Sequence, residues 1–478
     1  MNRLLFERST GNIGPNVFAR LQSTKLLHSF EPTPQIRFNG GENGTAVKID
    51  ENGAIDPNTP SSIWAHQAGV NALALDRFDG KVLISGGIDG SIRLWDLEQC
   101  SDPTKGHTYT PAVDIPRSPE THKFGITHLS FFPFDPHSFL STSYDKTLKA
   151  WSTRCGTLAA SFDLGHRIYT HATSPIAHHL LVACGTQHPA TRLVDLRTGS
   201  FVQSLPGQRG AVLATSWSPR DEHILATGGV DGTVKLWDIR RAGGVVGMLN
   251  KDDGLGVFHN GNMDPSGRVR LQTSAKAHTA PANGLTWTDD GAYLVSAGHD
   301  AKIRVWDIAT GRNTLASFGP TIKNSQLGSA IMFTSPVGLT HPGEELLFWP
   351  NEKEILVLDL HDGHVVTKLR ETGPSVTGIR TSTGATQEIP NRITSIVWRG
   401  AGGGDKSSGA VMGGSNTAGA VFGAHLDGQI RAWTPRLEGD DNEDDDDSLD
   451  ASNEERTKKR RALNDVFQGL MEKKINFS

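Results

Sequence analysis

Four residue types recur together along this chain of 478 residues and could perform chemistry: histidine, serine or threonine, aspartate and tryptophan. The set is complete at His66, Ser85, Asp89 and Trp95. Further members follow in the same order at His122, Ser141, Asp145, Trp151, Thr227, Asp231, Trp237, His278, Ser296, Asp300, Trp306, Asp427 and Trp433. Histidine, a hydroxyl group and aspartate are the components of a hydrolytic triad. A catalytic set occurs once, whereas this set repeats, so we interpret it as structural and predict no catalytic residue.

The repeated residues stand in a recurring strand pattern. In five clear copies an Asp precedes a Trp by six residues, in "DGSIRLWD" (89–96), "DKTLKAWS" (145–152), "DGTVKLWD" (231–238), "DAKIRVWD" (300–307) and "DGQIRAW" (427–433). Between the Asp and the Trp, apolar residues alternate with Arg or Lys. This period is typical of a β-strand with one buried face.

Two weaker copies bring the number of units to seven: "HPATRLVD" (188–195) has Val194 in the Trp place, and "EKEILVLD" (352–359) has Leu358. The units resemble the WD40 family, whose repeats of about 40–45 residues each form one blade of a β-propeller. The resemblance implies an all-β, seven-bladed propeller with insertions in the longer units. It also implies that the His, hydroxyl, Asp and Trp of one blade form a buried hydrogen-bonded chain, which satisfies the charged Asp of a tight turn. Gln208 stands in the His place of the fourth unit, so we expect an incomplete chain there.

The composition favours many short strands in an intracellular protein. The chain has 53 Gly, 24 Pro and a net charge of −5, without the broad Lys and Arg excess of a self-sufficient nucleic-acid-binding protein. Its three cysteines match no zinc motif and suit a reducing compartment. No apolar run is long enough for a signal peptide or a membrane span. We expect a soluble protein without a metal, cofactor or small-molecule ligand, and with only indirect nucleic-acid contact, if any.

The last blade needs an outer strand from elsewhere in the chain. After Trp433 the sequence turns acidic within a few residues, so a segment ahead of the first blade must supply that strand. "TKLLHSF" (24–30) and "GTAVKID" (44–50) are both candidates. The expected domains are therefore a helix-loop-helix over 1–30, the propeller over 31–437 and a tail over 438–478.

Insertions and the tail have strongly biased compositions. Segments 241–275 and 399–419 are rich in Gly and polar residues, and we interpret both as tolerated loop insertions rather than binding elements. Residues 438–455 contain eleven acidic side chains and are expected to be disordered. The basic run that follows could be a nuclear localisation signal, which we favour, or a solvated patch; it contains Lys458, Lys459, Arg460 and Arg461. One predicted helical face then carries Leu463, Val466, Phe467 and Leu470, and could dock on a partner or remain a terminal peptide.

An arginine follows the Trp-Asp position in units two to four, at Arg154, Arg197 and Arg240. A strand of seven residues spans about 20 Å, so these arginines lie on the face opposite the Asp turns. The planar donor fork of arginine suits a carboxylate or backbone carbonyl groups of a partner. Each arginine could instead pair with an acid of its own blade. Because three adjacent blades carry one, we favour an interaction surface.

The N-terminal segments "NRLLFERSTG" and "PNVFARLQSTKLL" predict two short helices. Their apolar patches contain Leu4, Leu5, Phe6, Val17, Phe18 and Leu21. Helices shorter than about 12–15 residues are marginal alone, so we expect them to dock on a partner or on the propeller. A frayed terminus is the alternative.

Both features resemble WD40 substrate receptors of a cullin-RING ubiquitin ligase. "WDIR" (237–240) is similar to the WDxR box of these receptors, whose arginine faces a triple-propeller adaptor. The copy at 151–154 lacks the Asp and the copy at 194–197 lacks the Trp. Receptors of this class also insert an N-terminal helix-loop-helix into the adaptor's cleft. The resemblance therefore implies that the three arginines and the apolar residues of both helices bind the adaptor.

Within this class the chain resembles the Cockayne syndrome group A family over residues 3–437. The segments that carry the likeness are "ERSTG", "QSTK", "SYDKTLKAW", "VLATSWSPRDEHILATGGVDGTVKLWDIRRA", "AHTAPANGLTWTDDGAYLVSAGHDAKIRVWD" and "GRNTLASFG"; the basic tail lies outside the family pattern. The resemblance implies a non-catalytic, nuclear substrate-recognition subunit in transcription-coupled nucleotide excision repair. Its implied partners are the damaged-DNA-binding triple-propeller adaptor of the cullin-four ligase, the Cockayne syndrome group B ATPase and the RNA polymerase II complex. The alternative is a nuclear WD40 scaffold of a histone-binding or RNA-processing complex, outside the ubiquitin system.

Overall fold

The computed structural model describes most of the N-terminal 435 residues. The described residues are 2–41, 64–99, 107–241, 244–251, 257–258, 276–326, 328–336, 339–341, 343–370, 376–380, 386–400 and 419–435. The acidic tract, the basic run and the last predicted helical face, as well as most of the insertions 241–275 and 399–419, lie outside these residues.

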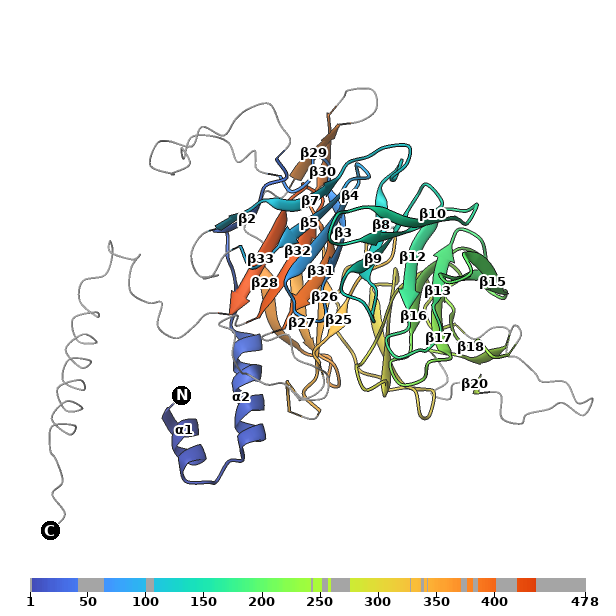
Figure 1. Cartoon of the computed structure of the whole chain (residues 1–478). Coiled ribbons are helices and arrows are strands. Elements are labelled where there is room, and N and C mark those ends of the chain that lie inside the picture. Colours follow the sequence, from blue (N-terminus) through green and yellow to red (C-terminus); the bar gives the residue numbers. More distant parts are fainter. Residues whose placement is uncertain are drawn as a thin grey trace, which may run out of the picture. The chain divides into compact units, whose positions relative to one another are not determined.

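The first three sheets are antiparallel and four-stranded, and their strands follow one another in chain order, except that β6 is left out between β5 and β7 (Figure 1). The first sheet contains β3 (Val70–Leu75), β4 (Val82–Gly87), β5 (Ile92–Asp96) and β7 (Pro111–Ile115). The second contains β8 (Ile126–Phe131), β9 (Ser138–Ser143), β10 (Thr147–Ser152) and β11 (Leu158–Asp163). The third contains β12 (Ile168–Thr173), β13 (Leu181–Thr186), β14 (Thr191–Asp195) and β15 (Ser200–Leu205).

The next three sheets repeat this arrangement with variations in length. The fourth has a fifth strand and contains β16 (Val212–Trp217), β17 (Ile224–Gly229), β18 (Val234–Asp238), β19 (Val245–Met248) and β20 (Val257–Phe258). The fifth contains β21 (Ala282–Trp287), β22 (Tyr293–Gly298), β23 (Lys302–Asp307) and β24 (Arg312–Asn313). The sixth contains β25 (Phe333–Thr334), β26 (Leu346–Pro350), β27 (Glu354–Asp359) and β28 (Val365–Arg370).

The seventh sheet joins the two ends of the described chain. It contains β31 (Ile393–Arg399), β32 (Ala420–His425) and β33 (Ile430–Pro435), and its outer strand is β1 (Phe30–Pro32). In the antiparallel register, Phe30 lies opposite Pro435 and Pro32 opposite Trp433. The N-terminal segment therefore closes the last blade, as expected, but the candidate 24–30 is wrong except for its last residue. The helix that precedes the strand runs to His28, and the other candidate, 44–50, lies outside the described residues.

The inner strands of successive sheets contact one another around a ring. β3 contacts β8, and the contacts continue from β8 to β12, β16, β21 and β25. β31 contacts β26 on one side and β3 on the other, which closes the ring. The described residues thus form a seven-bladed β-propeller, and the predicted fold class is confirmed; we number the blades one to seven in this order.

Outside the blades, the described residues contain two N-terminal helices and two small strand pairs. The helices are α1 (Asn2–Ser9) and α2 (Pro15–His28), with Pro15 in the first turn of α2, where its missing N–H costs no hydrogen bond. β2 (Ile36–Phe38) pairs in parallel with β6 (His107–Tyr109), and β29 (Val376–Arg380) forms a hairpin with β30 (Thr386–Pro390). Neither helix has the length and apolar character that a membrane crossing requires.

The turn between the two middle strands of a blade depends on its aspartate. In blade one, Asp89 Oδ1 accepts a hydrogen bond of 2.9 Å from the backbone N–H of Ser91, and Gly90 between them has a φ of 90°. In blade two the equivalent residue is Lys146, which adopts a φ of 72° although it is not glycine. The hydrogen bonds of Asp145 therefore hold a backbone conformation that L-residues avoid.

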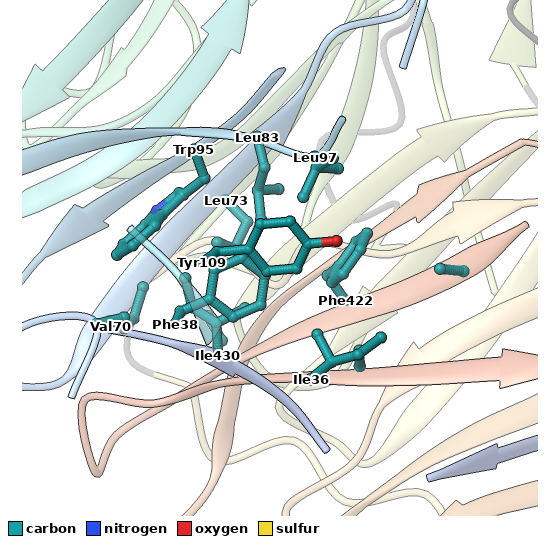
Figure 2. Packing of buried hydrophobic residues seen from close by; sticks show 14 residues of the cluster. Ile36, Phe38, Val70, Leu73, Leu83, Trp95, Leu97, Tyr109, Phe422 and Ile430 are labelled. Atoms are coloured by element: carbon teal, nitrogen blue, oxygen red, sulfur yellow. The ribbon is translucent and has the colours of Figure 1, made fainter. Parts of the chain in front are cut away.

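Apolar clusters between adjacent blades hold the ring together. Figure 2 shows the cluster between the first and last blades, where Phe38 stacks on Tyr109 at 5.1 Å and meets Trp95 edge-on at 5.2 Å. Phe422 of β32 contacts Phe38 from the other side, at 6.0 Å between ring centroids. The closure of the propeller thus rests on aromatic packing as well as on the short strand β1.

Three basic residues of the third strands are buried, so the prediction of one buried strand face is wrong for blades one, two and four. Arg93 is 2% exposed, Lys149 5% and Lys235 6%. Both faces of each sheet are covered because every blade lies between two others. The cations are compensated locally, since Arg93 Nε donates to Asp114 Oδ1 at 3.0 Å and Lys149 Nζ donates to the carbonyl oxygen of Glu120 at 2.6 Å.

Candidate functional site

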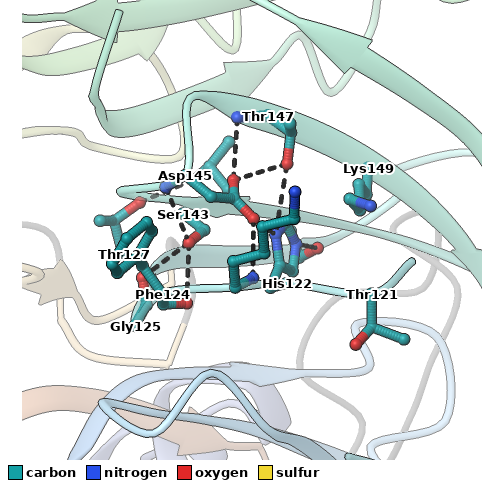
Figure 3. Close-up of polar contacts among 12 residues, drawn as sticks. Thr121, His122, Phe124, Gly125, Thr127, Ser143, Asp145, Thr147 and Lys149 are labelled. Atoms are coloured by element: carbon teal, nitrogen blue, oxygen red, sulfur yellow. Dashed lines mark hydrogen bonds and ion pairs between the residues drawn. The ribbon is translucent and has the colours of Figure 1, made fainter. Parts of the chain in front are cut away.

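The His, Ser, Asp and Trp of blade two form a continuous hydrogen-bonded chain. Figure 3 shows the aspartate end of this chain, where His122 and Thr147 contact Asp145. His122 Nε2 lies 2.7 Å from Ser141 Oγ, and its Nδ1 lies 2.8 Å from Asp145 Oδ2. The indole N–H of Trp151 donates to the same Ser141 Oγ at 2.7 Å. His122 and Ser141 are fully buried, so no substrate reaches this hydroxyl group. The geometry is that of a structural network rather than of a hydrolytic triad.

Blades one and five contain closely related chains. In blade five, His278 bridges Ser296 Oγ and Asp300 Oδ1, both at 2.9 Å, and Trp306 donates to Ser296 at 2.9 Å. In blade one the corresponding chain contains His66, Ser85 and Trp95, but the second imidazole nitrogen contacts a different group. Nδ1 of that histidine lies 2.7 Å from Ser91 Oγ and 3.8 Å from Asp89 Oδ1.

Blade four keeps a complete chain with glutamine in place of histidine, so the prediction of an incomplete network is wrong. Gln208 Nε2 donates to Thr227 Oγ1 at 2.9 Å, and Trp237 donates to the same oxygen at 2.8 Å. On the other side, Thr233 Oγ1 reaches Gln208 Oε1 at 3.2 Å and Asp231 Oδ1 at 2.7 Å. The side-chain amide has one donor and one acceptor end, which lets it replace the imidazole.

Blade seven satisfies its aspartate differently. Asp427 accepts from Asn391 Nδ2 at 3.1 Å and pairs with Arg431. Trp433 is buried but donates to the carbonyl oxygen of Arg370 at 3.2 Å, because Gly423 stands where blades one, two, four and five have a hydroxyl group. Asp427 and Trp433 therefore do not belong to one hydrogen-bonded chain.

The turn aspartates of blades one, two and five are held as carboxylates. Burial alone raises the pKa of Asp145, but the hydrogen bond and charge of His122 outweigh it and lower the pKa to about 2. The same causes hold the pKa of Asp89 and of Asp300 well below the ordinary range. Charged hydrogen bonds of this kind stabilise the turns at neutral pH.

On the opposite face, Arg240 is held by an acid of its own blade. Its Nε donates to Asp238 Oδ1 at 3.0 Å and its Nη2 to Asp238 Oδ2 at 2.9 Å, yet 64% of its side chain remains exposed. The hydrogen bonds from Arg240 lower the pKa of Asp238. The pair fixes the guanidinium group while its Nη1 edge has no partner within the described residues. The pairing is the alternative that the sequence left open, and it orients the arginine without covering it.

The other two rim arginines are arranged differently. Arg154 Nη2 lies 3.1 Å from His137 Nε2 at an exposed position. Arg197 is exposed, and its backbone N–H donates to Asp195 Oδ1 at 2.9 Å. The side chains of both are less fixed than that of Arg240.

A cavity of about 530 Å³ adjoins Arg240 between blades three and four. Its lining contains Ile176, His178, Arg220, Asp221, Glu222, His223, Ile224 and Arg240. The two blades are linked there, because Glu222 Oε2 accepts from the backbone N–H of His178 at 3.2 Å. The repeat pattern in the sequence does not indicate this cavity, because the cavity is lined by loops that carry no repeat signature.

The N-terminal helices expose part of their apolar surface. Phe6 is 66% exposed and Val17 42%, whereas Phe18 and Leu21 are half-buried and Arg8 covers the ring of Phe18 at 5.1 Å. The side chains of Leu4 and Leu5 lie outside the described part. At the other end of α2, Leu27 is buried in the core of blades six and seven. The last turn of α2 thus belongs to the propeller core, and exposed apolar residues lie towards the N-terminus.

Comparison with known proteins identifies the family. The chain matches the WD40 family, described as WD domain, G-beta repeat, over residues 58–96, 115–152, 199–238 and 269–307. It is 30% identical to WD repeat-containing protein ATCSA-1 of Arabidopsis thaliana over 319 residues, which are 55% of this chain and 71% of that relative. This chain belongs to the WD40-repeat proteins.

Other WD40-type relatives share a smaller part of their length with the chain. It is 30% identical to Radiation-sensitive protein 28 of Saccharomyces cerevisiae over 41% of this chain and 40% of that relative. It is 27% identical to ribosome biogenesis protein YTM1 of Podospora anserina over 51% of this chain and 54% of that relative. The chain spans about half the length of these two curated relatives.

The WD40 propeller offers one group of side chains with the spacing of metal ligands within its described part. Asp359, Asp362 and His364 place one ligand atom each within 4.8 Å of one another at the end of β27. The carboxylate of Asp359 already accepts the backbone N–H groups of His361 and Asp362, at 2.8 and 2.9 Å. These hydrogen bonds show that Asp359 stabilises a turn, which explains why the three side chains lie close together.

Proposed function

We propose that this WD40 protein is the substrate-recognition subunit of a cullin-RING E3 ubiquitin ligase acting in transcription-coupled nucleotide excision repair. In this function it bridges the damaged-DNA-binding triple-propeller adaptor of the cullin-four ligase to the Cockayne syndrome group B ATPase and the RNA polymerase II complex. It works in the nucleus and makes no covalent bond itself. In this proposal the chain acts as a ligase receptor of the Cockayne syndrome group A family does.

The fixed but exposed Arg240 carries the proposal. Asp238 holds two nitrogens of the guanidinium group, which lowers the entropy lost when a partner binds the remaining edge. The adjacent cavity offers Ile176, 38% exposed, as an apolar contact beside the charge. An arginine held in place beside a pocket is a residue type and setting common at energetic centres of protein interfaces.

The exposed faces of the N-terminal helices support the same function. Phe6 and Val17 present large apolar side chains to solvent, whereas the end of α2 is anchored in the core by Leu27. An anchored helix with an apolar face suits insertion into a groove of a partner. The names of two relatives, ATCSA-1 and Radiation-sensitive protein 28, also favour a role in DNA repair.

The test is adaptor binding by the purified chain, measured by co-elution and titration. Arg240→Lys keeps the charge but loses the two-pronged geometry, and Arg240→Glu reverses the charge. We expect Arg240→Glu and a deletion of residues 1–22 each to weaken binding by about tenfold or more. Arg312→Glu, an exposed charge reversal on blade five, is the matched control and should bind as the wild type does.

The second candidate is a nuclear WD40 scaffold outside the ubiquitin system. The likeness to ribosome biogenesis protein YTM1 favours it. If the wild-type chain does not bind the adaptor, or if Arg240→Glu and the deletion leave binding unchanged, the receptor function is wrong and the scaffold becomes the better proposal.

A further inference from the structure

Two arginines lie next to the inner strands of their blades, on the face of the propeller that carries the Asp turns. Arg240 lies on the other face. Arg167 immediately precedes β12, the inner strand of blade three, and Arg392 immediately precedes β31, the inner strand of blade seven. Their carbonyl oxygens accept from Gln187 at 2.9 Å and from Leu426 at 3.1 Å. Gly125 makes the equivalent bond in blade two, with Tyr144 as the donor at 3.3 Å. The repeat therefore places both arginines at one level around the propeller axis.

Two tyrosines complete this group, which we call the axial cluster: Tyr144, Arg167, Tyr169 and Arg392. The tyrosine rings meet edge-to-face with centroids 6.2 Å apart. Burial raises the pKa of Tyr144, and Tyr169 adds to the rise, while the charges of Arg167 and Arg392 oppose it. Residues from blades two, three and seven thus lie close enough to act on one hydroxyl group.

A segment between blades five and six holds one side of the cluster. Arg392 Nη1 donates to the carbonyl oxygen of Ser325 at 2.8 Å, and Gln326 Nε2 donates to that of Ile393 at 3.1 Å. The Nε atom of Arg392 is buried and has no acceptor among the described residues. Neither Arg167 nor Arg392 has a carboxylate within ion-pair distance in the described part of the chain. The cluster therefore contains two positive charges that no carboxylate among the described residues pairs with.

The same face carries further positive charge. Lys123 and Arg209 hold equivalent positions in blades two and four, where their backbone N–H groups donate to Asp145 at 3.2 Å and to Asp231 at 3.1 Å. Their side chains are exposed. The two turn aspartates are engaged by hydrogen bonds within their own blades. Phe124, which follows Lys123, is 57% exposed. The face thus combines uncompensated cations with an exposed aromatic ring.

We propose that the axial cluster binds the carboxylate groups of an acidic peptide segment of a partner protein. Guanidinium groups match carboxylates geometrically, and the hydroxyl group of Tyr144 adds a donor. The two arginines lie at one level around the propeller axis instead of tracking along a groove, which favours a compact anionic group over a nucleic-acid backbone. This goes beyond the proposed function, because it concerns the opposite face and requires no adaptor.

The test uses a fluorescein-labelled peptide of about twelve residues rich in glutamate, and its glutamine counterpart, with the full-length protein and anisotropy as the readout. We expect the glutamate peptide alone to bind, with an affinity that falls as salt is raised. Arg167→Gln and Arg392→Gln should each weaken it about tenfold, since each removes a charged hydrogen bond. Arg312→Gln, which removes an exposed charge from the outer strand of blade five, should bind as the wild type does.

Three outcomes would overturn the proposal. They are equal binding of both peptides, unchanged binding by Arg167→Gln, and tighter binding of a single-stranded oligonucleotide that the same variants abolish. A phosphoserine-containing version of the peptide separates phosphate from carboxylate recognition, and carboxylate recognition is overturned if only that version binds. Because Arg392 also bonds to Ser325, thermal melting checks the fold of its variant. The exposed Arg167 makes no such side-chain bond to another described residue. Adaptor binding should be unaffected by Arg167→Gln, so this proposal and the proposed function fail separately.

Discussion

At the scale of single residues, the propeller depends on buried polar chains that tolerate one specific exchange. Gln208 performs in blade four what histidine performs in blades two and five, because its amide presents a donor to Thr227 and an acceptor to Thr233. A buried donor or acceptor without a partner costs about 1–3 kcal/mol, so an apolar replacement at this position is costly.

Blade two provides the test of this exchange. His122→Gln should keep a donor for Ser141 and lower the free energy of unfolding by about 1 kcal/mol. His122→Leu has a similar volume but removes the hydrogen bonds of His122 to both Ser141 and Asp145, and should cost about 3 kcal/mol. Urea unfolding followed by tryptophan fluorescence measures both. Equal losses in the two variants would show that packing, and not hydrogen bonding, determines this position.

At the scale of elements, the closing strand β1 is short because it is an edge. It contributes only Phe30–Pro32, and Pro32 lacks an N–H group that a further strand could use. Its hold on the propeller comes from its side chains, since Phe30 is 5% exposed and packs in the same core as Leu27 and Trp433. Strand β1 is therefore held mainly by hydrophobic packing, and its short pairing with β33 sets its alignment.

Removing this anchor should weaken the whole ring. Phe30→Ala is expected to lower the free energy of unfolding by about 3–5 kcal/mol, the usual cost of emptying a buried phenylalanine site. Phe6→Ala removes the same side chain at a position that is 66% exposed, and should change stability by less than about 0.5 kcal/mol. Thermal and urea unfolding of the Phe30→Ala and Phe6→Ala variants measure both changes in stability. A small effect at Phe30 would mean that the other contacts of blade seven close the propeller unaided.

At the scale of the whole molecule, neighbouring blades are also joined by polar contacts across their inner strands. His128 of β8 and His171 of β12 approach each other with their Nδ1 atoms 3.3 Å apart, and Ser130 Oγ lies 2.7 Å from His171 Nε2. Burial lowers the pKa of His128 to about 4. Burial, and then the charge of His128, lower the pKa of His171 well below its ordinary value. Both rings are therefore neutral in the folded protein at neutral pH.

This pair should make the propeller sensitive to acid. In the unfolded chain a histidine has a pKa of about 6.5, so the unfolded state binds more protons between that value and the folded one, and stability falls as pH drops. For His128 alone the loss between pH 7.5 and pH 5 is about 2 kcal/mol. Urea unfolding at the two pH values should show a smaller pH dependence for His128→Asn than for the wild type. His137→Asn, at an exposed position, should keep the wild-type dependence; equal dependence in all three proteins would contradict the assignment.

Local repetition made the fold predictable. The Asp-to-Trp spacing, the alternation between them and the upstream histidines are short-range signals, so they specify strands, turns and the number of units without knowledge of what packs where. The hydrogen-bonded chains of blades two and five follow from the same signals. The complete hydrogen-bonded chain of blade four was not predictable from the sequence. Gln208 can replace histidine there because Thr233 lies close to it, and only the folded turn brings these two residues together.

What the sequence alone determined was therefore the repeated unit, the seven-bladed class and the need for an N-terminal segment to close the ring. Only the tertiary structure decided which residues close it, how Arg240 is oriented by Asp238, and where loops of blades three and four line an open pocket. It also buried Arg93 and Lys149, which the alternating pattern had placed in strands with one covered face. The physical reason is the same in each case: these features arise between blades, and contacts between distant segments leave no periodic trace in the chain.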